Sequence, residues 1–109
     1  MNEIAARIVV ASDHPSLAGH FPGRPIVPGV VLLDEVLAVI QGALGREVRL
    51  ASIVSTKFLQ AVEPAAQLDV HVRFADDARH TKARFVCARD GITVLEGSFL
   101  LANGLGGAT

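Results

Sequence analysis

Tryptophan and tyrosine are absent from the 109-residue sequence, and cysteine occurs only once. A core without the two largest aromatic side chains is built mainly from aliphatic residues. Cys87 has no second cysteine with which to form an internal disulfide, so we expect a protein of the reducing cytoplasm. This cysteine alternates with Ala83 and Phe85, which indicates a thiol in the core rather than a nucleophile.

The sequence also has no large excess of charge of either sign. It contains ten lysines and arginines and eleven acids, so the net charge is −1. Surfaces that bind nucleic acid carry a basic excess, so nucleic acid is not expected as a partner. No apolar run reaches the roughly 18 residues of a membrane-spanning helix, and the first ten residues lack the order of a signal peptide. The four histidines show no metal-binding spacing, so neither a metal nor a bound cofactor is expected.

Apolar residues, by contrast, are abundant: they make up 50% of the chain, and the mean hydropathy is +0.43. The length favours a single domain over residues 1–109, with the glycine-rich tail 103–109 flexible. A chain of this size builds only a small core. The apolar excess therefore favours a subunit interface or a tunnel for an apolar ligand.

The pattern of apolar residues predicts one helix and five strands. The helix, residues 29–43, is apolar nearly all round, which is typical of a buried helix, and Gly42 and Gly45 are candidate stop signals. Asp90-Gly91 is a strong hairpin signal between the last two strands. An α+β architecture follows, in which an antiparallel sheet wraps one buried helix. The strands are expected at residues 5–11, 48–60, 67–74, 80–88 and 92–102.

The segment "GHFPGRPIVPGV", residues 19–30, holds three of the five prolines and lies directly before the helix. Each proline fixes φ and lowers the entropy lost when the segment becomes ordered. His20 is therefore a titratable group held in a braced loop close to the helix N-terminus. At that terminus the amides of Gly29 and Val30 lack partners within the helix, so a developing oxyanion can bind there.

Asp34 and Glu35 interrupt the apolar run of the helix. A carboxylate buried without partners is costly, so these acids must reach water or enter a polar pocket. Together with His20 and the amides of Gly29 and Val30, Asp34 completes a set that suits proton transfer beside a carbonyl group. The other three histidines are expected to have no such role.

At these residues the sequence resembles the β-hydroxyacyl-acyl-carrier-protein dehydratases. Their pattern, roughly H-F-x-G-x-P-x-x-P-G-x-x-x-x-E/D, matches "HFPGRPIVPGVVLLD" from His20 to Asp34. The segments "KFLQAVEPAAQLDVHVRF" and "KARFVCARDGITVLEGSFLL" are also similar to the family, so the resemblance covers roughly residues 7–102. The short chain with "PGVVLLD" looks closer to the small dehydratases of specialised acyl pathways, such as aryl polyene synthesis.

The resemblance implies a hotdog fold and a homodimer, or a higher oligomer, with active sites shared between subunits. It also implies the loss of water from a 3-hydroxyacyl thioester to give the trans-2-enoyl thioester. The substrate would be carried on the phosphopantetheine of acyl carrier protein or on CoA. By position, His20 would remove the C2 proton, Asp34 would orient or protonate the departing hydroxyl, and the Gly29 amide would polarise the carbonyl.

The sequence departs from the family at three places. The acid is Asp34 where the family more often has Glu, Ala38 replaces a frequent Gln, and the family's Pro-Gly-Asp turn is Pro64-Ala65-Ala66. Two other interpretations therefore stay open. A hotdog acyl thioesterase would use the same helix terminus to direct water at the carbonyl, and a non-catalytic hotdog subunit would bind an acyl group without turnover.

Overall fold

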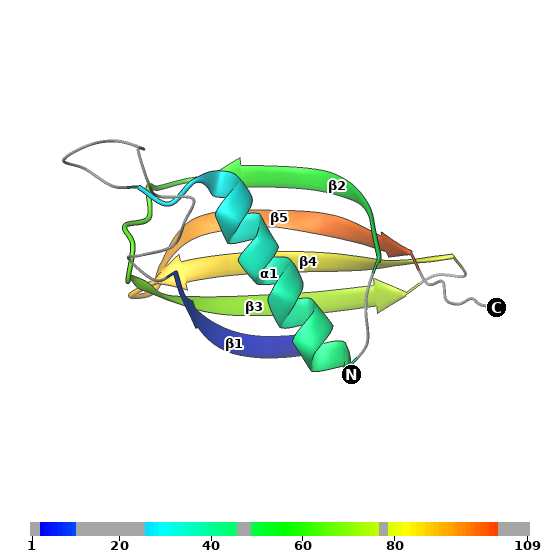
Figure 1. The fold of residues 1–109 in the computed structure, drawn as a ribbon. Helices are drawn as coiled ribbons and strands as arrows, with labels where there is room; N and C mark the ends of the chain where they lie inside the picture. Colours follow the sequence, from blue (N-terminus) through cyan, green and yellow to red (C-terminus); the bar gives the residue numbers. More distant parts are fainter. Residues whose placement is uncertain (1–2, 11–25, 46–48, 77–78, 103–109) are drawn as a thin grey trace.

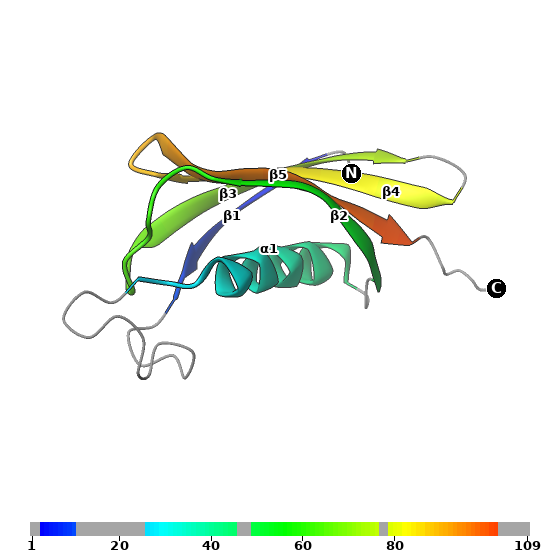
Figure 2. The same ribbon diagram turned by 90° about the horizontal axis from the view of Figure 1, so that it is seen from above.

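The computed structural model describes residues 3–10, 26–45, 49–76 and 79–102. The five strands form one antiparallel sheet in the order β1-β3-β4-β5-β2, and a single helix lies across one face of it (Figure 1). Turned by 90°, the sheet curves over the helix, and no helix of the described residues lies on its opposite face (Figure 2). This confirms the predicted α+β architecture. The elements are β1 (Glu3–Val9), α1 (Gly29–Leu44), β2 (Arg49–Phe58), β3 (Gln67–Asp76), β4 (His80–Arg89) and β5 (Ile92–Ala102).

Helix α1 begins directly after Pro28, whose extended backbone (φ −60°, ψ 144°) caps the helix. The helix ends at Gly45, which adopts the left-handed conformation at φ 67° and donates its amide to the Gln41 carbonyl oxygen over 3.1 Å. A glycine reaches this conformation without steric cost, so the stop predicted at Gly45 is confirmed. The stop predicted at Gly42 is wrong, because that residue lies inside the helix.

Only one face of α1 is buried in the isolated chain. Its four buried residues recur at helical spacing: Val31, Leu32, Val36 and Ile40. On the opposite face Val30 is 65% exposed, and Asp34 and Ala38 are also exposed. The prediction of an all-round buried helix is therefore wrong for one chain, because a single sheet covers a single face of a helix.

The centre of the sheet has the alternation that the sequence predicts. In β3 and β4 alternate side chains face the helix, and six of them are at most 1% exposed: Leu68, Val70, Val72, Ala83, Phe85 and Cys87. Phe85 packs on Phe99 of β5 with the ring centroids 4.7 Å apart and the rings tilted by 42°. Between β4 and β5, Asp90 (φ 51°) and Gly91 (φ 81°) form the predicted hairpin turn.

The strand ends differ from the predicted ones by one or two residues. Strand β1 begins and ends two residues earlier than expected, β2 is shorter at both ends, and β3 extends two residues further. The last strand has the predicted bounds, Ile92–Ala102. Such differences arise because strand ends depend on pairing with a neighbour, which a one-dimensional pattern does not contain.

Strand β2 forms an edge of the sheet, and nine of its ten residues are exposed. Its register with β5 shifts at two places, between Leu50 and Ser52 and between Ile53 and Ser55. Such irregularities bend a strand and increase its local twist. The curved β2 ends beside the first turn of α1 (Figure 1), and this is the region that carries the candidate site.

Candidate active site at the N-terminus of helix α1

The first turn of α1 has two backbone amides that find no hydrogen-bond acceptor among the described residues. The amides of Val31 and Leu32 both donate to the Pro28 carbonyl oxygen, at 3.0 and 3.4 Å. For the amides of Gly29 and Val30 no acceptor is present in the described part of the chain. Unpaired amides at a helix N-terminus carry the positive end of the helix dipole, so they suit an oxygen that gains negative charge. The oxyanion role predicted for the amides of Gly29 and Val30 suits this position and stays a prediction.

A groove of about 380 Å³ opens beside this turn. Its position is held by a backbone hydrogen bond of 2.8 Å from the Val27 amide to the Val62 carbonyl oxygen, which ties the segment before α1 to the segment after β2. Apart from the amide side chain of Gln60, its walls are apolar or backbone, so it suits an acyl group. The lining residues are Ile26, Val27, Gly29, Leu32, Phe58, Leu59, Gln60, Ala61 and Val62.

Of the two predicted catalytic side chains, the structure describes Asp34 but not His20. Asp34 lies on the exposed face of α1 and does not line the groove, so in one chain its carboxylate reaches water rather than a dry pocket. Glu35 is half-buried. His20 lies outside the described residues, as do His14, Phe21 and Arg24. The role predicted for His20 therefore stays a prediction.

The two histidines that the structure describes lie away from the groove. On the helix-free face of the sheet, His71 Nε2 is 2.7 Å from Glu3 Oε1, and Arg73 also approaches Glu3. His80 opens β4. Among the described residues, no group of three histidine, cysteine or carboxylate side chains is arranged to hold a metal ion. Within the same residues, no helix is long and apolar enough to cross a membrane.

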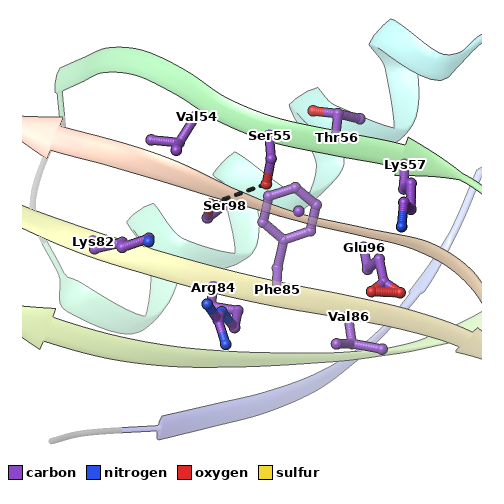
Figure 3. Close-up of a pocket in the computed structure, with 11 residues that line it drawn as sticks. Val54, Ser55, Thr56, Lys57, Lys82, Arg84, Phe85, Val86, Glu96 and Ser98 are labelled. Atoms are coloured by element: carbon purple, nitrogen blue, oxygen red, sulfur yellow. Dashed lines mark hydrogen bonds between the residues drawn. The ribbon is translucent and has the colours of Figure 1, made fainter.

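A second hollow, of about 390 Å³, lies on the helix-free face of the sheet, with α1 behind the strands (Figure 3). Lys57, Lys82 and Arg84 outnumber Glu96 in its lining, and the hydroxyls of Ser55 and Ser98 are 3.3 Å apart. Its described lining residues include neither a histidine nor a cysteine, and the sheet separates it from the helix N-terminus. We therefore assign the candidate site to the groove at α1.

Cys87 is a core residue, as predicted, and takes no part in the site. Its side chain is 0% exposed, between the buried residues of β3 and β5. Burial raises the pKa of the Cys87 thiol from 9.0 to about 12, because a thiolate is poorly solvated there. A thiol with such a pKa is not a nucleophile at neutral pH.

Sequence reasoning missed one contact at the site. A Cβ atom at residue 29 would lie 2.6 Å from Cζ of Phe58 and 2.8 Å from its Cε1, so the Phe58 ring fills the space that Gly29 leaves. We expected Phe58, part of the "KF" of the family resemblance, to line the core or a tunnel, and it does line the groove. The sequence carries no information about which residue the ring contacts.

Comparisons with known proteins agree with this architecture. The profile of the ApeI-like family, described as ApeI dehydratase, matches residues 1–98. A 3-hydroxyacyl-[acyl-carrier-protein] dehydratase FabZ from Novosphingobium aromaticivorans is 40% identical over 85 residues, covering 68% of this chain and 53% of that protein. The FabZ of Gluconacetobacter diazotrophicus is 31% identical over 100 residues, covering 83% of this chain and 62% of that one. The chain thus spans little more than half of these relatives.

Two solved structures are similar in fold. The dehydratase heterocomplex ApeI:P from Xenorhabdus doucetiae matches with a TM-score of 0.76 and 24% identity, covering 94% of this chain and 88% of that one. The fluoroacetyl-CoA thioesterase FlK matches with a TM-score of 0.72 and 11% identity, covering 93% and 84%. These likenesses confirm the hotdog fold and, at such identities, nothing more. The family profile supports a conclusion about the family as well as the fold, because it matches most of the sequence. By that match the chain belongs to the ApeI-like dehydratase family.

Proposed function

We propose that the protein is a dehydratase that removes water from a 3-hydroxyacyl thioester and yields the trans-2-enoyl thioester. The observation that carries the proposal is the pair of amides at Gly29 and Val30, which have no acceptor in the described part of the chain. They lie beside an apolar groove in a chain of the ApeI-like dehydratase family. A thioester carbonyl that accepts these amides becomes a better electron sink, so the neighbouring C2 proton becomes more acidic.

We assign a residue of this chain to each remaining proton transfer of the reaction. His20 takes the C2 proton, the C2 electron pair forms the new double bond to C3, and the C3 oxygen leaves as water after receiving a proton from Asp34. Atoms and charge balance, because the proton on His20 returns to solvent and Asp34 is reprotonated. By analogy with the FabZ relatives, whose names specify an acyl-carrier-protein substrate, the thioester is carried on phosphopantetheine. The cytoplasm remains the predicted location.

The active assembly is a homodimer that forms across the β2 edge. In one chain Asp34 is open to water and the long edge strand exposes Leu50, Ile53 and Val54. An exposed apolar edge with unpaired backbone groups is a surface for pairing with another strand. A second copy at this edge would shield Asp34 from water and supply the histidine of the shared site.

Mixing two inactive variants tests chemistry and assembly together. His20→Ala and Asp34→Asn are each expected to lower kcat by roughly 10² to 10⁴ while leaving the fold intact. If each site takes its histidine from one subunit and its acid from the other, unfolding and refolding the two variants together restores about a quarter of wild-type activity. If either variant keeps near wild-type turnover, the assigned roles are wrong, and if the mixture stays inactive, the sites are not shared.

The assay also separates the proposed reaction from its rivals. Enoyl thioester formation, followed by its ultraviolet absorbance, supports the dehydratase, whereas release of a free thiol identifies a thioesterase. Binding of the acyl thioester without either product identifies a non-catalytic subunit.

The β2 interface has its own test. Val54→Lys should convert the dimer to a monomer in light scattering, while Ile92→Lys, which changes a similarly exposed residue away from β2, should not. A wild-type chain that is monomeric alone would contradict the homodimer and indicate a different partner chain.

A further inference from the structure

The ring of Phe58 lies against the first turn of α1. Phe58 is the last residue of β2, and Figure 1 shows that end of the strand beside the start of the helix. The Cζ and Cε1 atoms of the ring would be only 2.6 and 2.8 Å from a Cβ at residue 29. Glycine at this position therefore allows the ring to touch the backbone whose amide forms the proposed carbonyl site.

The ring is also a wall of the groove. Phe58 and Gly29 both line it, together with Leu32 of α1 and Leu59 of the segment after β2. Half of the Phe58 side chain, 51%, is exposed, whereas Phe85 in the centre of the sheet is 0% exposed. A large aromatic group that lies half-exposed in a groove is free to contact a ligand there.

The position of the ring limits what can bind next to the Gly29 amide. If the thioester carbonyl oxygen accepts that amide, the substrate C2 atom is only two bonds away from the accepting oxygen. The ring already occupies the volume of a methyl group attached to residue 29. Because the acyl group would lie in the groove that Gly29 and Phe58 both line, we expect the ring to crowd a methyl branch on C2.

We propose that Phe58 is a specificity-determining residue, whose ring selects 3-hydroxyacyl thioesters that are unbranched at C2 over those that carry a 2-methyl group. The inference rests on the proposed dehydration at the Gly29 amide. It adds the class of acyl group that this site takes and names the side chain that decides it.

The test compares two substrates that differ by one methyl group: a 3-hydroxyacyl thioester of phosphopantetheine and its 2-methyl homologue. We expect the wild type to prefer the unbranched substrate in kcat/KM by roughly tenfold or more, the usual range for one methyl group in a pocket. Phe58→Ala should narrow this preference about tenfold, mainly by raising kcat/KM for the branched substrate. Leu59→Ala is the matched control, because Leu59 also lines the groove and is 47% exposed.

A double-mutant cycle on melting temperatures tests the contact between Gly29 and Phe58 without an activity assay. Gly29→Ala should lower the melting temperature in the wild-type background, because the new methyl displaces the ring. It should have no such effect in the Phe58→Ala background, where no ring opposes the methyl. Equal shifts in both backgrounds would overturn the contact.

The outcomes separate the inference from the function on which it rests. If the wild type dehydrates the unbranched substrate and Phe58→Ala leaves the preference unchanged, the inference is overturned and the dehydratase stands. An equal change in Leu59→Ala also overturns it, since the effect would then belong to the groove in general. If the wild type converts neither substrate, both proposals are wrong.

Discussion

The centre of the sheet and its β2 edge differ in how completely the chain covers its own apolar side chains. In β3, β4 and β5 the inward side chains are buried between the sheet and α1, and two phenylalanine rings pack on each other. In β2, by contrast, apolar residues such as Ile53, Val54 and Phe58 are about half exposed. Stability is therefore concentrated in the centre, while the edge and the adjoining helix terminus retain surface for a partner and a ligand.

The largest expected effect is the difference in stability loss between alanine substitutions at two phenylalanines. Phe85→Ala should lower the free energy of unfolding by about 3–5 kcal/mol, because it removes a fully buried ring and leaves a cavity. Phe58→Ala should lower it by only about 1 kcal/mol, because half of that ring is already in water. Urea denaturation of the two variants measures the difference. Equal losses would mean that the β2 edge is as much a part of the core as the sheet centre.

The next largest effect is the difference in stability loss between alanine substitutions at two glycines. A Cβ at Gly97 would collide with the Ser55 carbonyl oxygen and lie 2.9 Å from Cζ of Phe85, so backbone would have to move. Gly97→Ala should therefore lower the free energy of unfolding by about 3 kcal/mol. At Gly29 the new methyl meets only the end of the Phe58 ring, which can swing towards solvent, and we expect a loss below about 1 kcal/mol. If Gly97→Ala were as mild as Gly29→Ala in urea denaturation, the centre would be less tightly packed than we infer.

A third effect is the pH dependence of the stability that the sheet centre contributes. The pKa of Cys87 is raised from 9.0 to about 12, so above pH 9 the unfolded chain loses the thiol proton while the folded chain keeps it. The contribution of this thiol to the free energy of unfolding is fully present below pH 9. It is lost as the pH rises from 9 towards 12, by about 1.4 kcal/mol per pH unit. Denaturation curves of wild type and Cys87→Ala at pH 8 and pH 10 isolate this contribution. A difference between the two proteins that does not change with pH would contradict it.

The smallest effect concerns the turn that follows the groove. Ala65 adopts φ 69°, where a Cβ is unfavourable, and its amide donates to the Val10 carbonyl oxygen over 2.7 Å. Ala65→Gly should relieve this strain and raise the free energy of unfolding by about 1 kcal/mol. Ala66→Gly is the matched control, since Ala66 has no positive φ and should gain nothing. A decrease in stability for Ala65→Gly would show that the constraint on the unfolded chain outweighs the strain.

The sequence predicted the sheet centre better than the edge, and the reason is physical. Side chains alternate strictly along β3 and β4, so the alternation alone assigns Leu68, Val70 and Phe85 to the buried face. Asp90-Gly91 could be assigned to the hairpin because both residues tolerate positive φ. For β2 the same residue types, among them Ile53 and Val54, did not reveal that they remain exposed, because exposure depends on which strand lies at the edge.

The sequence predicted where the helix begins, whereas the roles of the site residues stay predictions. The amides of Gly29 and Val30, which have no acceptor among the described residues, follow from the helix start that proline and glycine mark in the sequence. The exposure of Asp34 depends on which helix face the sheet covers, and an almost wholly apolar helix does not specify that face. The contact between Gly29 and Phe58 joins residues of two different elements, so no local pattern contains it.

The sequence by itself determined the order of the elements, the buried face of the central strands and the tight turn at Asp90-Gly91, and it offered Gly45 as one of two candidate ends of the helix. These features depend on neighbouring residues, through alternation and the sterics of φ. Only the tertiary structure decided that β2 lies at the edge, that Asp34 faces solvent in one chain and that Phe58 rests on Gly29. These features depend on strand order and on packing between distant segments, which the chain specifies only once it has folded.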